Sequence, residues 1–308
     1  MSDLNIVMYH YVRPILGSKN PNIKGLELDG FRRQLDFLTS QFNVIKAEQL
    51  LAAIRDGDSL PPNACWLTFD DGYRDHYQFV LPELIKRGLQ GTFFPPQAAV
   101  EQRQLLDANA IHYLLDKSNK TDHLSAAIDE GLLLSGATEE EISAYKMRYR
   151  RANRFDDAET IYVKRMLQHV LPKEMRQILL EDLIVKLLNK TSCDLADELY
   201  MTSEELQEMI SAGMFVGSHG AGHDWLNELD AKAQEFDIQT SLDFLKRLGA
   251  ESESWIMCYP FGAYSEETLS IISRLGASAG VTTRTAKADL AKDDALLLPR
   301  FDTNDFPQ

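Results

Sequence analysis

The sequence places Asp70 and Asp71 side by side, in "LTFDDGYRDHY", directly after a short apolar run. Adjacent carboxylates repel each other, so such a pair destabilises a fold unless a nearby cation compensates the charge. Further along the chain, "SHGAGH" supplies His219 and His223, four positions apart. One carboxylate and two imidazoles leave a position on a metal ion open for water, as in catalytic rather than structural zinc-like sites. These residue types therefore predict metal-assisted hydrolysis.

Each motif also has an ordinary structural explanation. An Asp-Asp pair before Gly72 can form an Asx turn that opens the next helix, and two histidines four positions apart also occur on surface loops. Gly220 and Gly222 each cost a helix about 1 kcal/mol relative to alanine, so we expect a tight loop over the histidine motif. Taken together, the motifs favour two roles for the aspartates: one ligates a cation, and the other takes a proton from water that the ion activates.

Short apolar runs alternate with amphipathic stretches along most of the chain. The alternation implies parallel strands joined by right-handed crossovers, either in a closed βα barrel or in an open doubly wound sheet. We predict strands over 5–9, 65–69, 91–94, 214–219, 255–259, 278–283 and 296–300 ("LLLPR"), and helices after "LDG" (28–30) and near 78–89, 201–213, 230–248 and 265–276.

Five of the predicted strands end in a polar residue or in a residue of special backbone shape. In parallel α/β folds the carboxyl ends of the strands lie on one rim, where active sites form. We therefore expect these residues to converge on a single site. They are His10, Asp70 with Asp71, His219, Pro260 with Phe261, and Arg300.

With "MYHYV" near the start, the motifs "TFDDG", "SHGAGH" and "YPFG" resemble those of the NodB-like polysaccharide deacetylases, carbohydrate esterase family 4. The resemblance implies an α/β fold, a deformed (β/α) barrel formed by residues 1–99 and 200–308. It also implies metal-dependent hydrolysis of the C–N amide bond that holds an acetyl group on an N-acetylated sugar, not of a peptide bond. Residues 100–199, which carry helical patterns, would form a large insertion on the active-site rim, as a lid or a side wall.

The resemblance also assigns roles to individual residues. Asp70 would be the general base, and Asp71, His219 and His223 would hold a divalent metal ion. We expect zinc, with cobalt, nickel, iron or manganese as alternatives. Phe261 would contribute its backbone N–H to the developing oxyanion, an interaction that stabilises the transition state by about 3 kcal/mol.

The chain departs from the family pattern at three places. Gly220 stands where the family usually has a loop-bracing Ser or Thr, and Cys258 stands where many members have an arginine that orients the catalytic aspartate. We predict that Arg300 supplies the missing guanidinium. No histidine follows His223, so the family's late catalytic histidine has no match and the general acid is unassigned. His10 is the candidate acid, the alternative being a histidine that is bonded only to backbone.

The composition is that of an ordinary globular chain of 308 residues, with 44% apolar and 26% charged residues. The net charge of −15 argues against nucleic acid as a partner. No stretch approaches the roughly 18 apolar residues of a membrane-spanning segment, and "MSDLNIVMYHYVRP" lacks the features of a signal peptide. The three cysteines form no CxxC pattern and read as reduced thiols. We therefore predict a cytoplasmic protein.

A cytoplasmic deacetylase does not meet finished cell-wall polymer, so we predict an N-acetylated or activated sugar that is a precursor in surface-glycan biosynthesis. Pro260 and Tyr73 are expected to contact it. The basic stretch 145–154 could bind an anionic handle on such a substrate, or form a solvated face paired with the acidic residues 139–141. Hydrolysis of a non-sugar cyclic amide, and carbohydrate binding without turnover, are the competing functions. The exact sugar, the acyl group and the oligomeric state are left open.

Overall fold

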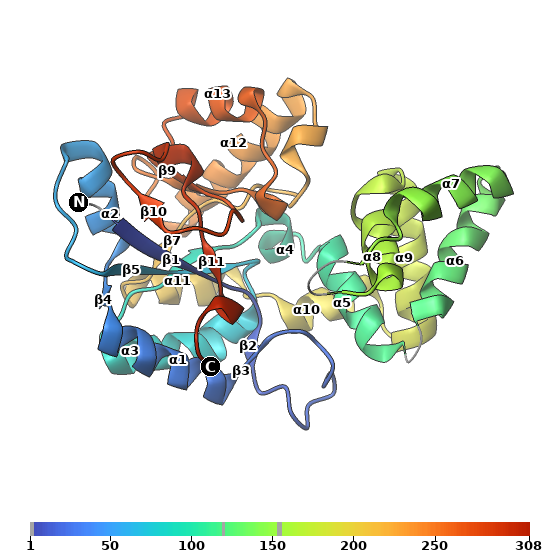
Figure 1. Cartoon of the computed structure of the whole chain (residues 1–308), viewed down its shortest axis with the longest axis horizontal. Helices are drawn as coiled ribbons and strands as arrows, with labels where there is room; N and C mark the ends of the chain where they lie inside the picture. The colour runs from blue at the N-terminus through green and yellow to red at the C-terminus, as the bar shows by residue number, and fades with distance from the viewer. Residues whose placement is uncertain (1–2, 119–120, 153–155) are drawn as a thin grey trace. The chain divides into compact units, whose positions relative to one another are not determined.

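The computed structural model describes residues 3–118, 121–152 and 156–308. The chain divides into two compact units (Figure 1). The first comprises Met1–Pro14, Gly25–Gln104 and Glu198–Gln308, and it contains all the motifs singled out above. The second comprises Ile15–Lys24 and Leu105–Asp197.

Parallel strands form the centre of the first unit (Figure 1). In the main sheet β1, β5, β6 and β7 pair in that order, β11 pairs in parallel with β1, β4 lies parallel to β5, and β10 lies antiparallel to β1. The strands are β1 (Asp3–Tyr9), β4 (Asn43–Val44), β5 (Ala64–Asp70), β6 (Thr92–Phe94), β7 (Phe215–Val216), β8 (Ile256–Cys258), β9 (Ala279–Val281), β10 (Ala288–Asp289) and β11 (Phe301–Asp302), beside the separate pair β2 (Val12–Arg13) and β3 (Leu26–Glu27).

Two single bridges close these strands into a ring. Ser218, just after β7, pairs in parallel with Met257 of β8, and the Cys258 N–H donates to the Ser218 carbonyl at 2.8 Å. β8 pairs in parallel with β9. Val281 of β9 then pairs with Leu298, from which the chain runs into β11 and so back to β1. The circuit is that of a deformed (β/α) barrel, so the α/β prediction is confirmed and the open doubly wound sheet is not what forms.

Alternation along β5 decides which side chains enter the barrel. Cys65, Leu67 and Phe69 belong to a core cluster that includes apolar residues of α1 (Leu28–Gln41) and α3 (Leu81–Arg87). Trp66 belongs to a second cluster that joins residues of β1, β6, β8 and β9. Since successive side chains of a strand point to opposite faces, Thr68 and Asp70 lie on the Trp66 face, toward the interior of the ring.

Capping residues set the starts of the helices that cover the barrel. Thr202 and Glu205 form a capping box at the start of α11 (Ser203–Ser211), with each side chain accepting a backbone N–H from the other residue. Asp230 caps α12 by accepting the Ala233 N–H at 2.9 Å. The remaining elements of this unit are α2 (Ala47–Asp56), η1 (His76–Val80), α4 (Gln97–Glu101), α11 (Ser203–Ser211), η3 (Leu226–Glu228), α12 (Ala231–Leu248), η4 (Pro260–Gly262), α13 (Glu266–Arg274), η5 (Ala295–Leu297) and η6 (Thr303–Asp305).

Two predictions at the ends of elements were clearly wrong. The predicted strand at 296–300 does not form: Leu296 and Leu297 lie in the 3-10 turn η5, which Asp294 caps by accepting the Leu296 N–H at 2.9 Å. Only Leu298 pairs with β9, and the following Pro299 has no N–H to donate, so pairing resumes at β11. The first helix begins at Leu28, so "LDG" forms its first turn rather than preceding it.

The second unit is helical. Buried Asp116 of α5 accepts the Asn22 N–H at 2.7 Å and the Asn20 side-chain amide at 2.8 Å, which holds the segment Ile15–Lys24 on this unit. Thr138 and Glu141 form a capping box at the start of α7. The elements between 105 and 199 are α5 (Asp107–Lys117), α6 (Thr121–Leu134), α7 (Glu139–Tyr149), α8 (Ala158–Arg165), η2 (Met166–Val170), α9 (Lys173–Leu188) and α10 (Ser192–Leu199). That the insertion forms a lid or side wall stays a prediction.

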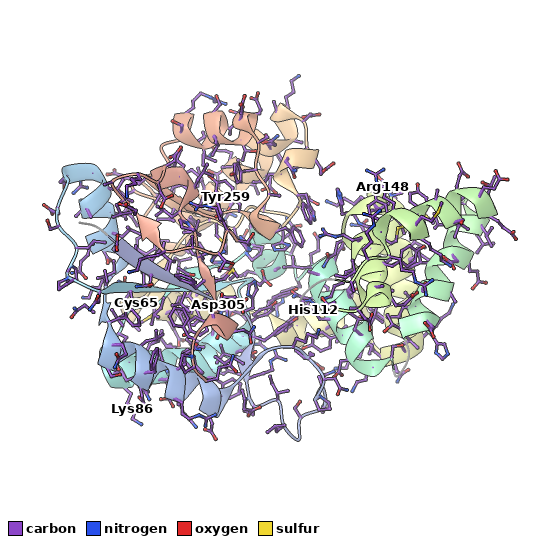
Figure 2. The ribbon with its side chains drawn as sticks, viewed as in Figure 1. Cys65, Lys86, His112, Arg148, Tyr259 and Asp305 are labelled. Atoms are coloured by element: carbon purple, nitrogen blue, oxygen red, sulfur yellow. The ribbon has the colours of Figure 1, made fainter. Side chains whose placement is uncertain are left out.

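The basic stretch of this unit has partners other than the acidic residues 139–141. Lys146 pairs with Asp129, and Arg150, which follows the end of α7, pairs with Glu159. The guanidinium of Arg148 (Figure 2) lies 5.1 Å from the centre of the Tyr149 ring. Arg154 lies outside the described residues. Within the described ranges, none of the helices combines the length and apolarity that crossing a bilayer requires.

Gly217 tests the closure of the barrel. A Cβ at this position would lie 2.5 Å from Phe94 Cε1 and 2.8 Å from the Ile256 carbonyl oxygen. We expect Gly217→Ala to lower the free energy of unfolding by about 1–3 kcal/mol, as overpacked cores do. The measurement is urea denaturation. The control is Gly30→Ala, in helix α1. The atom closest to the added Cβ would be the end of a flexible side chain, Leu26 Cδ1 at 3.1 Å, and alanine favours a helix over glycine, so the free energy of unfolding should be unchanged or higher. Equal stability of Gly217→Ala and wild type would contradict the tight closure.

Candidate active site

Asp70 and Arg300 form a buried ion pair at the carboxyl ends of the barrel strands. Arg300 donates from Nη1 to Asp70 Oδ1 at 2.8 Å and from Nη2 to Oδ2 at 2.7 Å. The residues are 2% and 1% exposed. Burial alone would raise the pKa of Asp70, but the charge and hydrogen bonds of Arg300 outweigh it and hold this pKa below its ordinary value. Asp70 is therefore ionised at neutral pH, and its charge is neutralised by a fixed partner.

Arg300 is itself held on three sides by the barrel. Its Nε donates to the Thr282 carbonyl at 2.9 Å, and Nη1 donates to Thr68 Oγ1 at 3.1 Å. Nη2 lies 3.3 Å from Cys258 Sγ. Cys258 thus lies beside the guanidinium. Arg300 supplies a guanidinium to Asp70, as predicted, but it does so from the segment between Leu298 and β11 rather than from the end of the predicted strand.

Asp71 faces the two histidines. Its Oδ1 lies 3.4 Å from His219 Nε2 and 3.4 Å from His223 Nε2. Burial would raise the pKa of Asp71, but hydrogen bonds from both imidazoles hold it well below its ordinary value. Whereas Arg300 stabilises the charged form of Asp70, the imidazoles of His219 and His223 stabilise that of Asp71.

The three side chains fit a divalent metal ion. One ligand atom from each of Asp71, His219 and His223 lies within 4.8 Å of the others. Two ligands about 2.0–2.1 Å from a tetrahedral zinc ion lie about 3.4 Å apart, which is the separation of Asp71 Oδ1 from each imidazole nitrogen. The donor set of one carboxylate and two imidazoles also leaves a position open. The structure therefore contains a possible Asp/His metal site.

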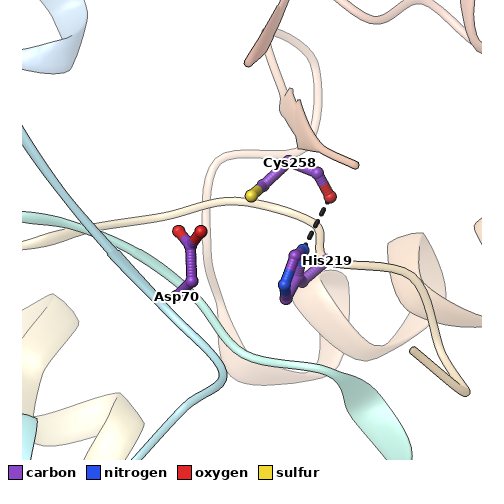
Figure 3. Close-up of side chains that lie close together, drawn as sticks. All are labelled: Asp70, His219 and Cys258. Atoms are coloured by element: carbon purple, nitrogen blue, oxygen red, sulfur yellow. Dashed lines mark hydrogen bonds between the residues drawn. The ribbon is translucent and has the colours of Figure 1, made fainter. Parts of the chain in front are cut away.

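Backbone contacts fix which nitrogen of His219 faces the site. Its Nδ1 lies 2.7 Å from the Cys258 carbonyl oxygen (Figure 3), so Nδ1 carries the proton and Nε2 is left to bind an ion. Burial would lower the pKa of His219, but Cys258 and Asp71 outweigh it and raise this pKa well above its ordinary value. A proton and a metal ion therefore compete for Nε2.

Asp70, His219 and Cys258 form a second cluster of ligand-type atoms (Figure 3). Arg300 bonds Asp70 and contacts Cys258 Sγ, and burial raises the pKa of the Cys258 thiol. A protonated thiol beside a guanidinium is a poor cation ligand. The donor atoms of Asp71, His219 and His223 therefore fit a cation better than those of this second cluster.

Left-handed backbone conformations concentrate at this site. Three of the six non-glycine residues with positive φ in the described chain are Asp71 (72°), His223 (55°) and Phe261 (58°). Each such conformation costs an L-residue about 1–2 kcal/mol and marks sites where the surroundings impose the geometry. At Asp71, it turns the side chain toward the histidines while Asp70 still follows the strand.

Phe261 lies in the turn η4, directly after β8, and is flanked by aromatic rings. Its ring stacks on Trp225 with centroids 4.6 Å apart and meets the His223 ring edge-on at 4.7 Å. These contacts fix the turn that carries the Phe261 N–H, the predicted oxyanion donor.

His10 directly follows β1 and lies beside Asp70. Its Nε2 lies 3.9 Å from Asp70 Oδ2, and its side chain is 42% exposed. Burial lowers the pKa of His76 to about 4, so the neutral His76 ring can donate from Nε2 to the His10 carbonyl at 2.8 Å. His10 is therefore more than a backbone-bonded histidine, because its ring reaches both solvent and Asp70.

The structure does not support a substrate contact for Tyr73 or Pro260. Tyr73 has no exposed surface because its ring stacks between Tyr11 and Tyr200, and its hydroxyl donates to Asp71 Oδ2. Pro260 is buried in the first position of η4. Tyr73 is thus placed to orient Asp71, and Pro260 to shape the turn before Phe261.

Comparisons with known proteins show similarity to polysaccharide deacetylases. Residues 184–280 match the polysaccharide deacetylase family model. The chain is 32% identical over 89 residues to YxkH of Bacillus subtilis (strain 168), which carries a polysaccharide deacetylase name. The resemblance to the polysaccharide deacetylases is confirmed. The match to YxkH covers 29% of this chain and 32% of that relative. The segment that matches the family model, residues 184–280, includes His219, His223 and Phe261, whereas Asp70 and Asp71 precede it.

Solved structures of deacetylases share the fold over nearly the whole chain. The Streptococcus pyogenes deacetylase PplD, in complex with acetate, is 19% identical with a TM-score of 0.60, over 97% of this chain and 92% of that one. IcaB from Ammonifex degensii is 17% identical with a TM-score of 0.56, over 97% and 91%. The BpsB deacetylase domain from Bordetella bronchiseptica is 14% identical with a TM-score of 0.54, over 97% and 95%. At these identities the likeness shows the NodB-type fold.

Two residues that orient the site were missed in the sequence. Thr68 lies two residues before Asp70, on the same face of β5, and that spacing was the available signal. Asp237 accepts backbone N–H groups of the histidine loop. Its signal was a carboxylate next to Ile238 in the middle of the predicted helix 230–248.

The Tyr73 hydroxyl gives a direct test of the Asp71 assignment. We expect Tyr73→Phe to keep the fold, because the ring still fits its stack, and to bind Zn²⁺ about 10–100-fold more weakly, the usual effect of losing such a supporting hydrogen bond. The measurement is competition with a chelating dye. Tyr77→Phe, which removes a hydroxyl that donates to Glu208, is the matched control. Equal Zn²⁺ affinity of Tyr73→Phe and wild type would contradict the role.

Proposed function

We propose that the protein is a metal-dependent deacetylase that hydrolyses the acetyl–nitrogen bond of an N-acetylated sugar. The observation that carries the proposal is the pairing of two adjacent buried aspartates with different partners: Arg300 on Asp70, and the imidazoles of His219 and His223 on Asp71. This arrangement separates a base from a metal ligand. The deacetylase fold and the family match support the same reaction class.

Asp70 supplies the base. Because Arg300 lowers its pKa, the carboxylate is ionised at neutral pH and can accept the proton of the water that attacks the acetyl carbonyl. The two hydrogen bonds from Arg300 also fix the orientation of the carboxylate, which keeps its free lone pairs in one direction. Positioning of this kind is a large part of what a catalytic base contributes.

Asp71, His219 and His223 would hold the metal ion, with Tyr73 orienting Asp71 and the Cys258 carbonyl orienting His219. We infer zinc from the donor set, with other divalent transition metals able to use it. When bound, the ion would act as a Lewis acid on the acetyl carbonyl and lower the pKa of water.

The remaining steps concern charge and proton delivery. The N–H of Phe261, held by the stack of its ring on Trp225, would donate to the oxyanion that forms on the acetyl carbonyl. His10 would protonate the leaving amine, since its ring lies by Asp70 and is partly open to solvent. Alternatively, Asp70 itself could give the amine the proton that it accepted from water.

We propose the substrate class on two grounds. The reaction class indicates an N-acetylated sugar, and the expected cytoplasmic location favours a precursor of surface-glycan synthesis over a finished polymer. A protein that binds carbohydrate without turnover would have no need of the ionised, guanidinium-clamped Asp70. A cyclic amide would use the same groups, so a substrate panel has to separate these cases.

Asp70→Asn tests the function. The variant keeps the size of the side chain and leaves Asp71 and both histidines in place, so we expect Zn²⁺ binding to persist. Acetate release should fall by about 10²–10⁴-fold, the usual contribution of general base catalysis. The measurement is metal content together with acetate release from N-acetylated monosaccharides, UDP-linked sugars, polymeric chitin and a cyclic amide.

The outcomes of that experiment separate the alternatives. Full activity in Asp70→Asn would remove Asp70 as the base. Activity on chitin alone would remove the precursor proposal, and activity on the cyclic amide alone would replace the sugar. Metal binding without acetate from any substrate would favour the binding protein.

Arg300→Met tests how the base is tuned. Without the guanidinium, burial is unopposed and the pKa of Asp70 rises. As the pH falls, Asp70 therefore becomes protonated, and inactive as a base, at a higher pH than in the wild type. We expect the acidic limb of the kcat profile to move to higher pH by at least about one pH unit. Arg300→Lys, which retains a cation, should move it less. An acidic limb at the wild-type pH in Arg300→Met would contradict the clamp.

A further inference from the structure

The carboxylate of Asp237 grips the loop between the two candidate metal ligands. The Ala221 N–H donates to Oδ1 at 3.0 Å, and the Gly222 N–H donates to Oδ2 at 2.7 Å. Ala221 and Gly222 are two of the three residues that separate His219 from His223. One side chain thus binds two consecutive backbone N–H groups, and hydrogen bonds to an ionised acceptor are stronger than those between neutral groups.

Asp237 belongs to the buried face of α12. The residue is 8% exposed, and Ile238 and Ser241 of the same helix are fully buried. Ser241 Oγ lies 2.8 Å from Ser218 Oγ, so α12 also holds the residue directly before His219. A buried carboxylate is unfavourable unless hydrogen bonds compensate it. Here the histidine loop supplies that compensation.

The close approach of Asp237 explains why position 220 has no side chain. A Cβ on Gly220 would lie 2.6 Å from Asp237 Oδ1, and this glycine also has φ +69°. The Ser or Thr that the resemblance leads one to expect at this position would therefore collide with the carboxylate. The loop is braced from α12 instead of by a hydroxyl of its own.

The bracing bears directly on His223. This histidine has a left-handed backbone (φ 55°) and immediately follows Gly222, whose N–H is held by Asp237. A strained residue keeps its conformation only where its surroundings impose it. We propose that Asp237 is a positioning residue that keeps the Nε2 atoms of His219 and His223 converged on Asp71, an inference that rests on the metal site of the proposed function.

The first test measures the affinity for Zn²⁺ alone, by competition with a chelating dye, so that no substrate is needed. Asp237→Ala and Asp237→Asn should both bind Zn²⁺ about 10–100-fold more weakly than wild type. The amide variant keeps the volume but can present only one acceptor oxygen to two N–H donors, which covers the case in which the alanine variant fails to fold. Asp243→Asn, an exposed residue of the same helix, is the matched control and should bind as wild type.

The outcomes distinguish this inference from the function on which it rests. Wild-type affinity in both Asp237 variants would overturn the positioning role and leave the metal site intact. No Zn²⁺ binding by the wild type would instead remove the metal site itself, and the inference with it.

A double-mutant cycle tests the contact between Asp237 and position 220. Gly220→Ala should weaken Zn²⁺ binding in the wild type, because its Cβ meets Asp237 Oδ1, and weaken it by a smaller factor in the Asp237→Ala background. The backbone strain at φ +69° is the same in both backgrounds and cancels in the cycle. Equal factors in the two backgrounds would overturn the proposed contact.

Discussion

Asp70 and Asp71 are adjacent, and only 2% and 5% of their surface is exposed, so the negative charge of each has to be compensated for this barrel to be stable. A buried charge without a partner is strongly unfavourable. Asp70 has a permanent partner in Arg300, whose two hydrogen bonds match its two oxygens. Within the described residues, Asp71 contacts the imidazoles of His219 and His223 and the hydroxyl of Tyr73. That difference is the basis on which we propose Asp71 as a ligand of a cation and Asp70 as a base.

The fold supplies the geometry that this separation needs. Alternation along β5 points Asp70 into the barrel, where Arg300 arrives from the opposite end of the sequence through the strand that closes the ring. The left-handed backbone of Asp71 then turns the next side chain out of the strand register. The histidine loop and the Phe261 turn follow strands that are joined by the Ser218–Met257 bridge, so they arrive as neighbours.

The sequence was sufficient for what is encoded locally. Most strands and the residues of the three motifs could be placed because alternation and spacing are properties of short segments. Arg300 was matched to Asp70 because both were expected to end parallel strands, although Arg300 in fact directly precedes β11. The family resemblance added the roles, which spacing alone does not assign.

What could not be predicted depends on contacts between distant segments. Tyr73 was expected to meet substrate, but its burial comes from rings at positions 11 and 200, which no local pattern connects. The strand expected at 296–300 is displaced because Asp294 caps a turn. Asp237 was overlooked because a single carboxylate on an amphipathic helix gains its meaning only from the loop packed against it.

The most direct test of the account is a crystal structure of the Zn²⁺-loaded protein, with anomalous scattering to locate the ion. The account predicts one ion bound by Asp71, His219 Nε2 and His223 Nε2, at about 2.0–2.2 Å from each, with Asp70 still paired to Arg300. An ion bound instead by Asp70, His219 and Cys258, or one that displaces Arg300 from Asp70, would contradict the separation of base and metal ligand.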